Sequence, residues 1–198
     1  EEKPTLEWRV KPFTIQDSGI ISDNDIKVGY LNFAHSDSLG KHLDYSSSRL
    51  QTQNFLYRPT KYKQAVFTPE VGFIGTHYDK TNSGGSSTAL FGVLGGEASM
   101  NMYKIYGNSR HVIKPYARYD YYHKFEDSPD NHYIFDIDDS WSKLNMLRVG
   151  VHNMLLKKDE RGVYPSITGD LYTNAFFSTS SIPKNIPKIY GDISYGEF

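Results

Sequence analysis

Apolar and polar residues alternate most clearly along residues 109–157. In the first part of this stretch, apolar side chains and charged or hydroxyl-bearing side chains take turns. The two sets are Ile113, Ala117, Tyr119 and Tyr121, with Pro115 among them, against Lys114, Tyr116, Arg118 and Asp120. Further on, Leu147, Val149 and Val151 alternate with Arg148, Gly150 and His152. A period of two predicts two long β-strands, each with an apolar face and a charged face.

Similar patterns predict strands over most of the remaining chain. The predicted strands are Leu6–Ile15, Ile26–Ala34, Tyr45–Tyr57, Tyr62–Tyr78, Ala89–Tyr106, Tyr164–Phe177 and Ile189–Tyr195. Turn-forming residues separate them, as at Asp17–Asp25 and in the Gly/Ser-rich stretch Asp79–Ser87. Strands joined one after another by such loops form a meander. The expected fold class is therefore all-β, an antiparallel up-and-down meander of about nine or ten strands.

Two classes of protein have strands of this kind. A soluble sheet buries its apolar face in a core, whereas a transmembrane barrel turns that face to lipid and its polar face to a wet lumen. Several predicted strands are much longer than the ~5–6 residues usual in globular proteins. Aromatic residues near strand ends are typical of the girdles of outer-membrane barrels. The girdle candidates are Tyr62, Tyr78, Tyr103, Tyr106, Tyr119, Tyr121, Tyr122, Tyr164, Phe176 and Phe177. This pattern favours a transmembrane β-barrel, or a section of a larger one, with residues 1–198 as a single domain.

Composition narrows the classes of function. The mean hydropathy is −0.57, and no stretch approaches the roughly 20 apolar residues of a transmembrane helix. A barrel strand needs only about 9–11 residues and is polar at alternate positions, so low hydropathy is compatible with a barrel. The net charge of −1 gives no reason to expect a nucleic acid or an anionic membrane surface as a partner. Because the sequence contains no cysteine, disulfide and thiolate chemistry are excluded.

The sequence carries no recognisable catalytic or cofactor-binding motif. A nucleophile elbow, a phosphate-binding loop, a dinucleotide fingerprint and a metal-spaced Cys/His set are all missing. Asp136, Asp138 and Asp139 form an acidic cluster whose oxygens suit a divalent cation, but a solvated loop is the favoured interpretation. We therefore expect no enzyme activity, no cofactor and no metal site. An outer-membrane lipase or deacylase is the enzymatic alternative.

Charged residues recur on the strand faces opposite the apolar residues. A lysine or arginine that faces lipid at mid-depth costs about 2–4 kcal/mol, so these side chains must face water. In a barrel they line the lumen, with mixed signs that neutralise one another. In a soluble sheet they form the solvated outer surface. The candidate lumen-lining or ligand-binding residues are Arg49, Glu70, Glu97, Lys114, Arg118, Asp120, Arg148 and Asp170.

Short motifs follow one another in order between Thr68 and Thr173. They are TPEVGFIGTHYDK at 68–80, HVIKP at 111–115, FDIDD at 135–139 followed by LRVGVHN at 147–153, and DLYT at 170–173. In their order and spacing, these motifs resemble strands of the lipopolysaccharide-assembly outer-membrane protein family (LptD, also called the organic solvent tolerance family). The resemblance implies a β-barrel in the outer membrane of a Gram-negative cell. Such a barrel receives lipopolysaccharide from a periplasmic bridge and inserts it into the outer leaflet.

The resemblance also implies a plug lipoprotein as a partner and a periplasmic β-jelly-roll domain. The chain is too short for that whole architecture and lacks the cysteines of many members, so we expect a section of such a barrel or a shorter relative. The expected function is lipopolysaccharide assembly and translocation, with lipopolysaccharide or another lipid as ligand. The alternatives are a general outer-membrane pore and a soluble β-domain that binds lipid or carbohydrate.

Overall fold

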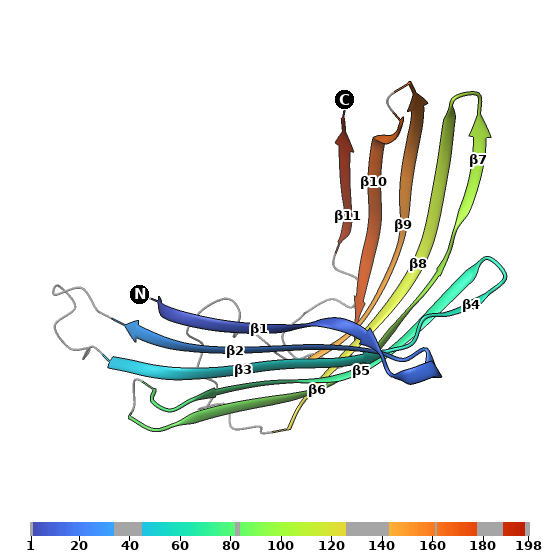
Figure 1. Cartoon of the computed structure of the whole chain (residues 1–198). Coiled ribbons are helices and arrows are strands. Elements are labelled where there is room, and N and C mark those ends of the chain that lie inside the picture. The colour runs from blue at the N-terminus through green and yellow to red at the C-terminus, as the bar shows by residue number, and fades with distance from the viewer. Residues whose placement is uncertain are drawn as a thin grey trace. The chain divides into compact units, whose positions relative to one another are not determined.

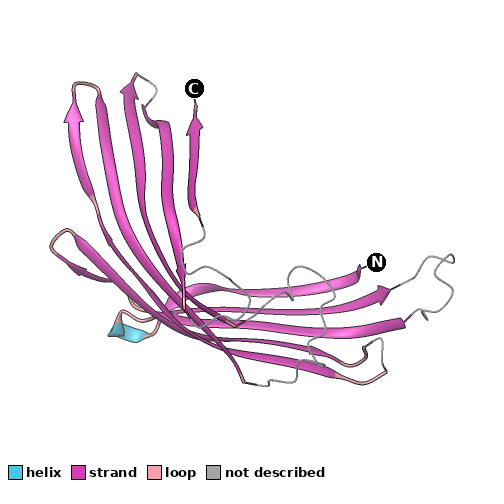
Figure 2. Cartoon of the chain, turned by 180° about the vertical axis from the view of Figure 1, so that it is seen from behind, coloured by secondary structure: helices cyan, strands magenta, loops and turns pink. Residues whose placement is uncertain are grey.

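The computed structural model is built from β-strands, and it describes residues 2–33, 45–81, 84–125, 143–160, 162–177 and 188–196. Within these residues there are eleven strands and one short 3-10 helix, η1 (Gln16–Ser18). The strands are β1 (Glu2–Thr14), β2 (Ile21–Phe33), β3 (Tyr45–Tyr57), β4 (Thr60–Tyr62), β5 (Ala65–Tyr78), β6 (Ser87–Met100), β7 (Met102–Tyr106), β8 (Ser109–Lys124), β9 (Leu144–Asp159), β10 (Gly162–Phe176) and β11 (Ile189–Tyr195). Figure 2 shows that strands account for nearly all of the regular structure. Among the described residues, no helix is long and apolar enough to cross a membrane.

The strands pair in the order of the sequence. The order in the sheet is β1-β2-β3-β5-β6-β8-β9-β10-β11, while β4 pairs with β5 and β7 pairs with β8 (Figure 1). The ladders from β1 to β5 and from β9 to β11 are antiparallel. This confirms the predicted all-β antiparallel meander. β1 and β11 stand at the two ends of the order, so the sheet formed by the described strands is not closed.

The chain divides into two compact units. Unit 1 comprises Glu1–Tyr57, Glu70–Leu94 and Tyr122–Lys143, and unit 2 comprises Arg58–Pro69, Gly95–Tyr121 and Leu144–Phe198. Unit 1 therefore holds β1, β2 and β3, and unit 2 holds β4, β7, β9, β10 and β11. β5, β6 and β8 contribute residues to both units.

Several strand boundaries differ from the predicted ones, and the structure gives the reason for three of them. β2 begins at Ile21 instead of Ile26, because η1 and the left-handed Gly19 (φ 71°) complete the turn within a few residues. The predicted strand Tyr62–Tyr78 divides into β4 and β5 at Lys63, which has a positive φ of 54°. The predicted strand Ala89–Tyr106 divides at Asn101, whose N–H donates to the carbonyl oxygen of Gln64 at 3.3 Å. Neither the positive φ at Lys63 nor the hydrogen bond from Asn101 to Gln64 changes the alternation of apolar and polar residues, so the sequence pattern could not predict these breaks.

Pro12 lies in β1, the strand at one end of the sheet order. The register of β1 against β2 shifts between Val10 and Phe13, around this residue. Proline has no N–H to donate to a neighbouring strand, so it is accommodated at an edge or a bulge. Pro165 in β10 likewise precedes a register shift, which falls between Pro165 and Ile167.

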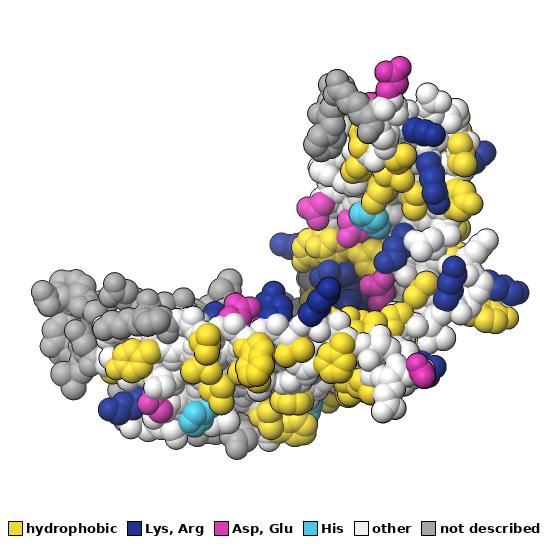
Figure 3. All heavy atoms as spheres, viewed as in Figure 1, with side chains coloured by type: hydrophobic (Ala, Val, Ile, Leu, Met, Phe, Trp, Pro, Cys, Tyr) yellow, Lys and Arg dark blue, Asp and Glu magenta, His cyan; other side chains and the backbone are white. Residues whose placement is uncertain are grey.

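One face of unit 1 is apolar and exposed. Leu6 pairs with Val28, and Val28 pairs with Leu50, so three neighbouring strands present apolar side chains on one face. These side chains are 71%, 45% and 46% exposed. The same face continues in Trp8, Val10, Ile26, Tyr30, Leu56, Val71 and Phe73. Figure 3 shows hydrophobic side chains gathered over these strands. An apolar surface of this extent marks contact with lipid or with another protein.

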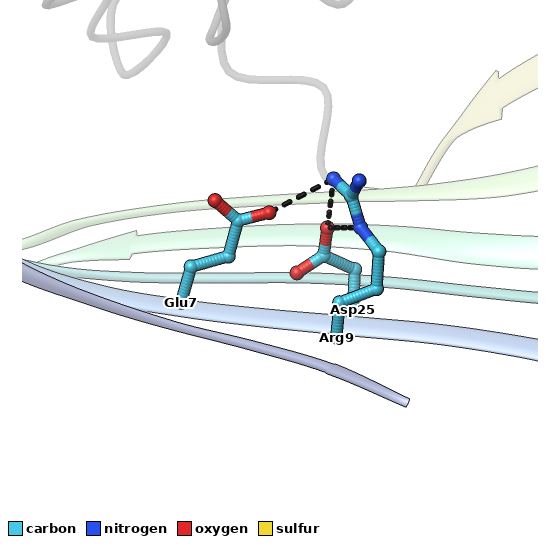
Figure 4. A network of polar contacts seen from close by, with 3 residues as sticks. All are labelled: Glu7, Arg9 and Asp25. Carbon is cyan, nitrogen blue, oxygen red and sulfur yellow. Dashed lines mark hydrogen bonds and ion pairs between the residues drawn. The ribbon is translucent and has the colours of Figure 1, made fainter. Parts of the chain in front are cut away.

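The opposite face of unit 1 is polar near β1 and packed near β6. Arg9 of β1 forms ion pairs with Asp25 of β2 (3.0 Å) and with Glu7 (2.8 Å), as Figure 4 shows. Toward β6, a core cluster of Ile74, Phe91 and Val93 is nearly inaccessible to solvent. The two faces therefore differ in kind: charges and a core lie on one, and exposed apolar side chains lie on the other.

Two predicted girdle residues lie in the interior of unit 1. Tyr78 is 2% exposed, and its ring lies under the guanidinium of Arg49, whose Cζ is 5.9 Å from the ring centroid. Tyr122 packs against the core cluster that contains Ile74 and Phe91. Their alternation places both tyrosines on the core side of their strands, so they cannot contribute to an outer girdle. Of the other girdle candidates, Tyr62 and Tyr103 are strongly exposed.

The end of β5 is fixed by Asp79, the residue that follows it. Asp79 Oδ1 accepts hydrogen bonds from the N–H of Ser48 at 2.7 Å and from the hydroxyl of Ser47 at 3.0 Å. Burial raises the pKa of the Asp79 carboxyl, but these hydrogen bonds outweigh it, and the pKa lies below its usual value. The contacts join the end of β5 to the start of β3.

Gly72 allows β5 to approach β3 more closely than any side chain permits. A Cβ at this position would lie 2.4 Å from the carbonyl oxygen of Asn54 and 2.5 Å from Cδ1 of Phe55. At Gly75 on the same strand, the nearest atoms to such a Cβ are 3.5 Å away, which is ordinary contact. Gly72 is thus required by packing, whereas Gly75 is not.

We expect Gly72→Ala to destabilise the fold by about 1–3 kcal/mol or more, because the new methyl group overlaps backbone that cannot move away cheaply. Gly75→Ala is the matched control and should be neutral or slightly stabilising, since alanine is favoured over glycine in a strand by roughly 0.5–1 kcal/mol. Urea unfolding of the refolded chain followed by far-UV circular dichroism measures both. Equal stability of the two variants would contradict the close approach at Gly72.

Candidate functional site

The polar face of unit 2 is formed by alternate residues of four strands. Arg148 on β9 pairs with Asn174 on β10, and His152 pairs with Asp170. Paired residues of a ladder share a face, and so do alternate residues of one strand. The polar face, as defined here, consists of Glu97 of β6, Lys114, Tyr116, Arg118 and Asp120 of β8, Arg148 and His152 of β9, and Asp170, Tyr172 and Asn174 of β10. Six of the eight residues predicted from the sequence belong to it.

Tyr116 crosses β9 to reach a carboxylate on β10. Its hydroxyl donates to the Asp170 carboxylate, with Oη 3.0 Å from Oδ2 and 3.3 Å from Oδ1. The crossing runs over Gly150, where an added Cβ would lie 2.7 Å from the Tyr116 ring and 2.8 Å from Cβ of Tyr172. A glycine in a strand interior often marks such a close approach. Because Gly150 has no side chain, the Tyr116 ring can cross β9 and reach Asp170.

Arg148 lies between an amide and an aromatic ring. Its Nε donates to Oδ1 of Asn174 at 3.0 Å, and its Cζ lies 4.5 Å from the centroid of the Tyr172 ring. The Tyr172 ring in turn stacks on Tyr190 of β11, with centroids 5.2 Å apart and planes 16° from parallel. Among the described residues, Arg148 forms no ion pair with a carboxylate. An oriented guanidinium that is not neutralised by a carboxylate is suited to bind a phosphate or a carboxylate of a ligand.

Two ion pairs occupy the β8 side of the polar face. Lys114 Nζ lies 2.9 Å from Oε1 of Glu97, and both side chains are about one-third exposed. Arg118 Nε contacts both carboxylate oxygens of Asp120, at 3.0 and 3.1 Å. The Asp120 side chain is only 8% exposed, so water stabilises its negative charge little and Arg118 is needed to balance it. Glu97 is more exposed, so its negative charge needs Lys114 less.

The remaining two predicted residues belong to unit 1. Arg49 is 2% exposed, and its Nη2 donates to Oε1 of Gln51 at 2.8 Å, so it is packed among side chains. Glu70 pairs in register with Tyr57 at the start of the unit 1 portion of β5. Six of the eight candidates thus lie on the polar face of unit 2, and the other two lie in unit 1.

The face of unit 2 opposite the polar face is apolar and exposed. Leu171 pairs with Val151, and Val149 pairs with Thr173. Val149 and Leu171 are 48% and 56% exposed. Ile189 and Ile193 of β11 are more exposed still. Strands β9, β10 and β11 thus separate a hydrogen-bonded charged surface from an apolar one.

Sequence reasoning did not single out Tyr116, Gly150, Tyr172 or Tyr190 as site residues. Their contribution depends on which residues stand opposite one another on neighbouring strands, and this register is not visible in one sequence. The one sign of this arrangement in the sequence is Gly150, which stands between Arg148 and His152 at alternate positions of β9. Such a glycine indicates that an aromatic side chain from a neighbouring strand lies over it.

The described residues contain no group of three or more His, Asp or Glu side chains placed to hold a metal ion. The acidic cluster at Asp136, Asp138 and Asp139 lies outside the described residues. The polar face brings hydroxyl, carboxylate, amide and guanidinium groups into contact with one another. No protein-family model matches the sequence, and no curated protein matches it.

Proposed function

We propose that the chain forms part of the wall of an outer-membrane β-barrel that takes part in lipopolysaccharide assembly and translocation. The observation that carries the membrane part is the opposition of two faces on the same strands. Val149 and Leu171 present exposed apolar side chains on one face, while Arg148 and Asp170 lie on the other. If lipid covers the apolar face and water covers the polar face, both the apolar and the charged side chains lie in a favourable environment.

The polar face supports a phosphorylated saccharide as the ligand class. Arg148 supplies a guanidinium for a phosphate, and the stacked rings of Tyr172 and Tyr190 lie beside it. Aromatic rings offer apolar surface to the C–H faces of sugars. Hydroxyl groups donate and accept hydrogen bonds, and carboxylate groups accept them. The family resemblance adds lipopolysaccharide as the specific ligand, with a plug lipoprotein and periplasmic bridge proteins as partners. Translocation needs no covalent chemistry, so the chain is proposed not to be an enzyme.

The first experiment asks whether the fold depends on an amphiphile. The chain is refolded with and without detergent micelles, and sedimentation, far-UV circular dichroism and heat-modifiable gel mobility are recorded. We expect β-structure with heat-modifiable mobility in micelles and association in plain buffer. A compact monomer in plain buffer would contradict the membrane role and favour a soluble lipid- or carbohydrate-binding domain.

The second experiment tests the ligand in a Gram-negative cell that produces the chain in its outer membrane. A photo-reactive phenylalanine analogue replaces Tyr172 on the polar face, and in a matched control it replaces its neighbour Leu171 on the apolar face. Lipopolysaccharide adducts are expected at position 172 in preference to 171. Adducts at 171 alone, or at neither, would contradict passage along the polar face. Large ion conductance in planar bilayers would favour a general pore.

A further inference from the structure

One end of unit 2 combines exposed basic residues with exposed aromatic ones. In the antiparallel order, the turn between β4 and β5, the turn between β7 and β8, and the carboxyl end of β9 lie at the same end of their strands. The N–H of Lys158 donates to the carbonyl oxygen of Asn108 at 2.9 Å, which joins the end of β9 to the β7–β8 turn. These segments, residues 58–64, 102–111 and 157–160, are called the basic rim below.

The basic rim is positively charged although the chain as a whole is not. The net charge of the chain is −1. The basic rim holds seven lysines and arginines against two carboxylates. The cations are Arg58, Lys61, Lys63, Lys104, Arg110, Lys157 and Lys158, and the carboxylates are Asp159 and Glu160. Positive charge is thus concentrated at this end of unit 2.

Three cations of the basic rim contact aromatic rings instead of carboxylates. Arg110 Cζ lies 4.0 Å from the ring centroid of Tyr103, and Lys104 Nζ lies 5.2 Å from that of Tyr106. Lys63 Nζ similarly lies 5.5 Å from the Tyr62 ring. Among the described residues, none of these three cations forms an ion pair with an acidic side chain. Their charge is therefore available to an external anion.

Apolar side chains stand beside these charges. Ile105 and Tyr103 on one face of β7 are 65% and 61% exposed, and Tyr106 on its other face is 54% exposed. Tyr62 at the end of β4 is 72% exposed. Both faces of β7 and the tip of β4 therefore present apolar surface to their surroundings. Amphipathic aromatic rings and lysine or arginine together are typical of residues at the boundary between lipid and water. Such residues place rings among the acyl chains and cations among the headgroup phosphates.

We propose that the basic rim binds the phosphate groups of anionic lipid headgroups at a bilayer surface. The charge excess selects an anionic surface, and the exposed rings require that surface to have an apolar layer beneath it. A nucleic acid or an acidic protein meets the first condition but not the second. The inference does not depend on the proposed transport of lipopolysaccharide. Headgroup binding uses the charges of the basic rim, whereas insertion into a bilayer uses the apolar faces and needs no charged headgroup.

The test measures flotation of the whole chain with vesicles of phosphatidylcholine alone and of phosphatidylcholine mixed with phosphatidylglycerol. We expect tighter binding to the mixed vesicles, and we expect sodium chloride to weaken that preference by screening. The variant Lys104→Gln/Arg110→Gln/Lys158→Gln should bind the mixed vesicles at least about tenfold more weakly, as the loss of three surface cations predicts. Its binding to phosphatidylcholine should be unchanged.

The control variant Lys11→Gln/Lys80→Gln/Lys188→Gln removes the same charge from exposed lysines outside the basic rim. Equal loss in the control, or equal binding of the wild-type chain to both kinds of vesicle, would overturn the inference. Release by inorganic phosphate beyond that by chloride at matched ionic strength would instead indicate a free-phosphate site and would also overturn it. Heat-modifiable mobility in neutral micelles reports insertion separately, so a failure of the basic rim is distinguishable from a failure of the proposed function.

Discussion

The double variant Val149→Arg/Leu171→Arg is expected to lose insertion into lipid vesicles. Both positions lie on the apolar face of unit 2, on the adjacent strands β9 and β10. An arginine facing lipid at mid-depth costs about 2–4 kcal/mol, so two cost roughly 4–8 kcal/mol. That cost is comparable to the whole stability of a typical domain, about 5–15 kcal/mol. Flotation with phosphatidylcholine vesicles and heat-modifiable mobility measure the loss.

The matched control places two arginines on the opposite face of the same part of the sheet. Thr168 and Ser194 pair across β10 and β11, and their hydroxyls are hydrogen-bonded. Thr168→Arg/Ser194→Arg adds the same charge, but its side chains face water beside Asp170 and Asp192. We expect insertion to be retained. If the variant at Val149 and Leu171 inserted as well as this control, the apolar face would not contact lipid.

The same pair of variants separates the membrane role from a soluble sheet. Val149 and Leu171 are about half exposed, so in a soluble protein an arginine at either position would extend into water and cost little. The sequence pattern alone left open whether this row of residues forms a buried core. Because this row is exposed in the structure, the arginine substitutions do not disrupt a core. They abolish insertion only if lipid covers the apolar face of unit 2.

Local periodicity explains how much of the fold the sequence predicts. β3 and β11 begin and end where alternation and flanking turn residues placed them, because strand faces follow from a period of two. Strand breaks at Lys63 and Asn101 were missed, since each depends on a backbone conformation or a hydrogen bond to another strand. The hydrophobic period continues across both breaks.

The candidate site was predicted in composition but not in arrangement. Alternation assigned Arg148 and Asp170 to polar faces, and the structure places them there. It could not show that Tyr116 reaches Asp170 over Gly150, because this contact spans three strands. It also could not show that Arg49 is buried and that its guanidinium lies over the Tyr78 ring. Register and burial are properties of the assembled sheet, and a single sequence does not contain them.

Arg118→Met is expected to destabilise unit 2 by about 3 kcal/mol, because it leaves the Asp120 carboxylate without its cation. The Asp120 side chain is 8% exposed, and Arg118 Nε contacts both of its oxygens. Arg118 is itself 37% exposed, so the cost lies at the lower end of the range for a buried pair. Urea unfolding in micelles measures the difference.

Lys114→Met provides the matched control on the same strand. Its partner Glu97 is 29% exposed and Lys114 is 36% exposed, so breaking that pair should cost only about 0–1 kcal/mol. Adding Asp120→Asn to Arg118→Met should recover most of the lost stability, because the amide leaves no buried charge unbalanced. Equal costs for the two methionine variants, or no recovery in the double variant, would show that Asp120 is solvated. The polar face would then be a wet surface over its whole width, and its two ion pairs would contribute equally little to the fold.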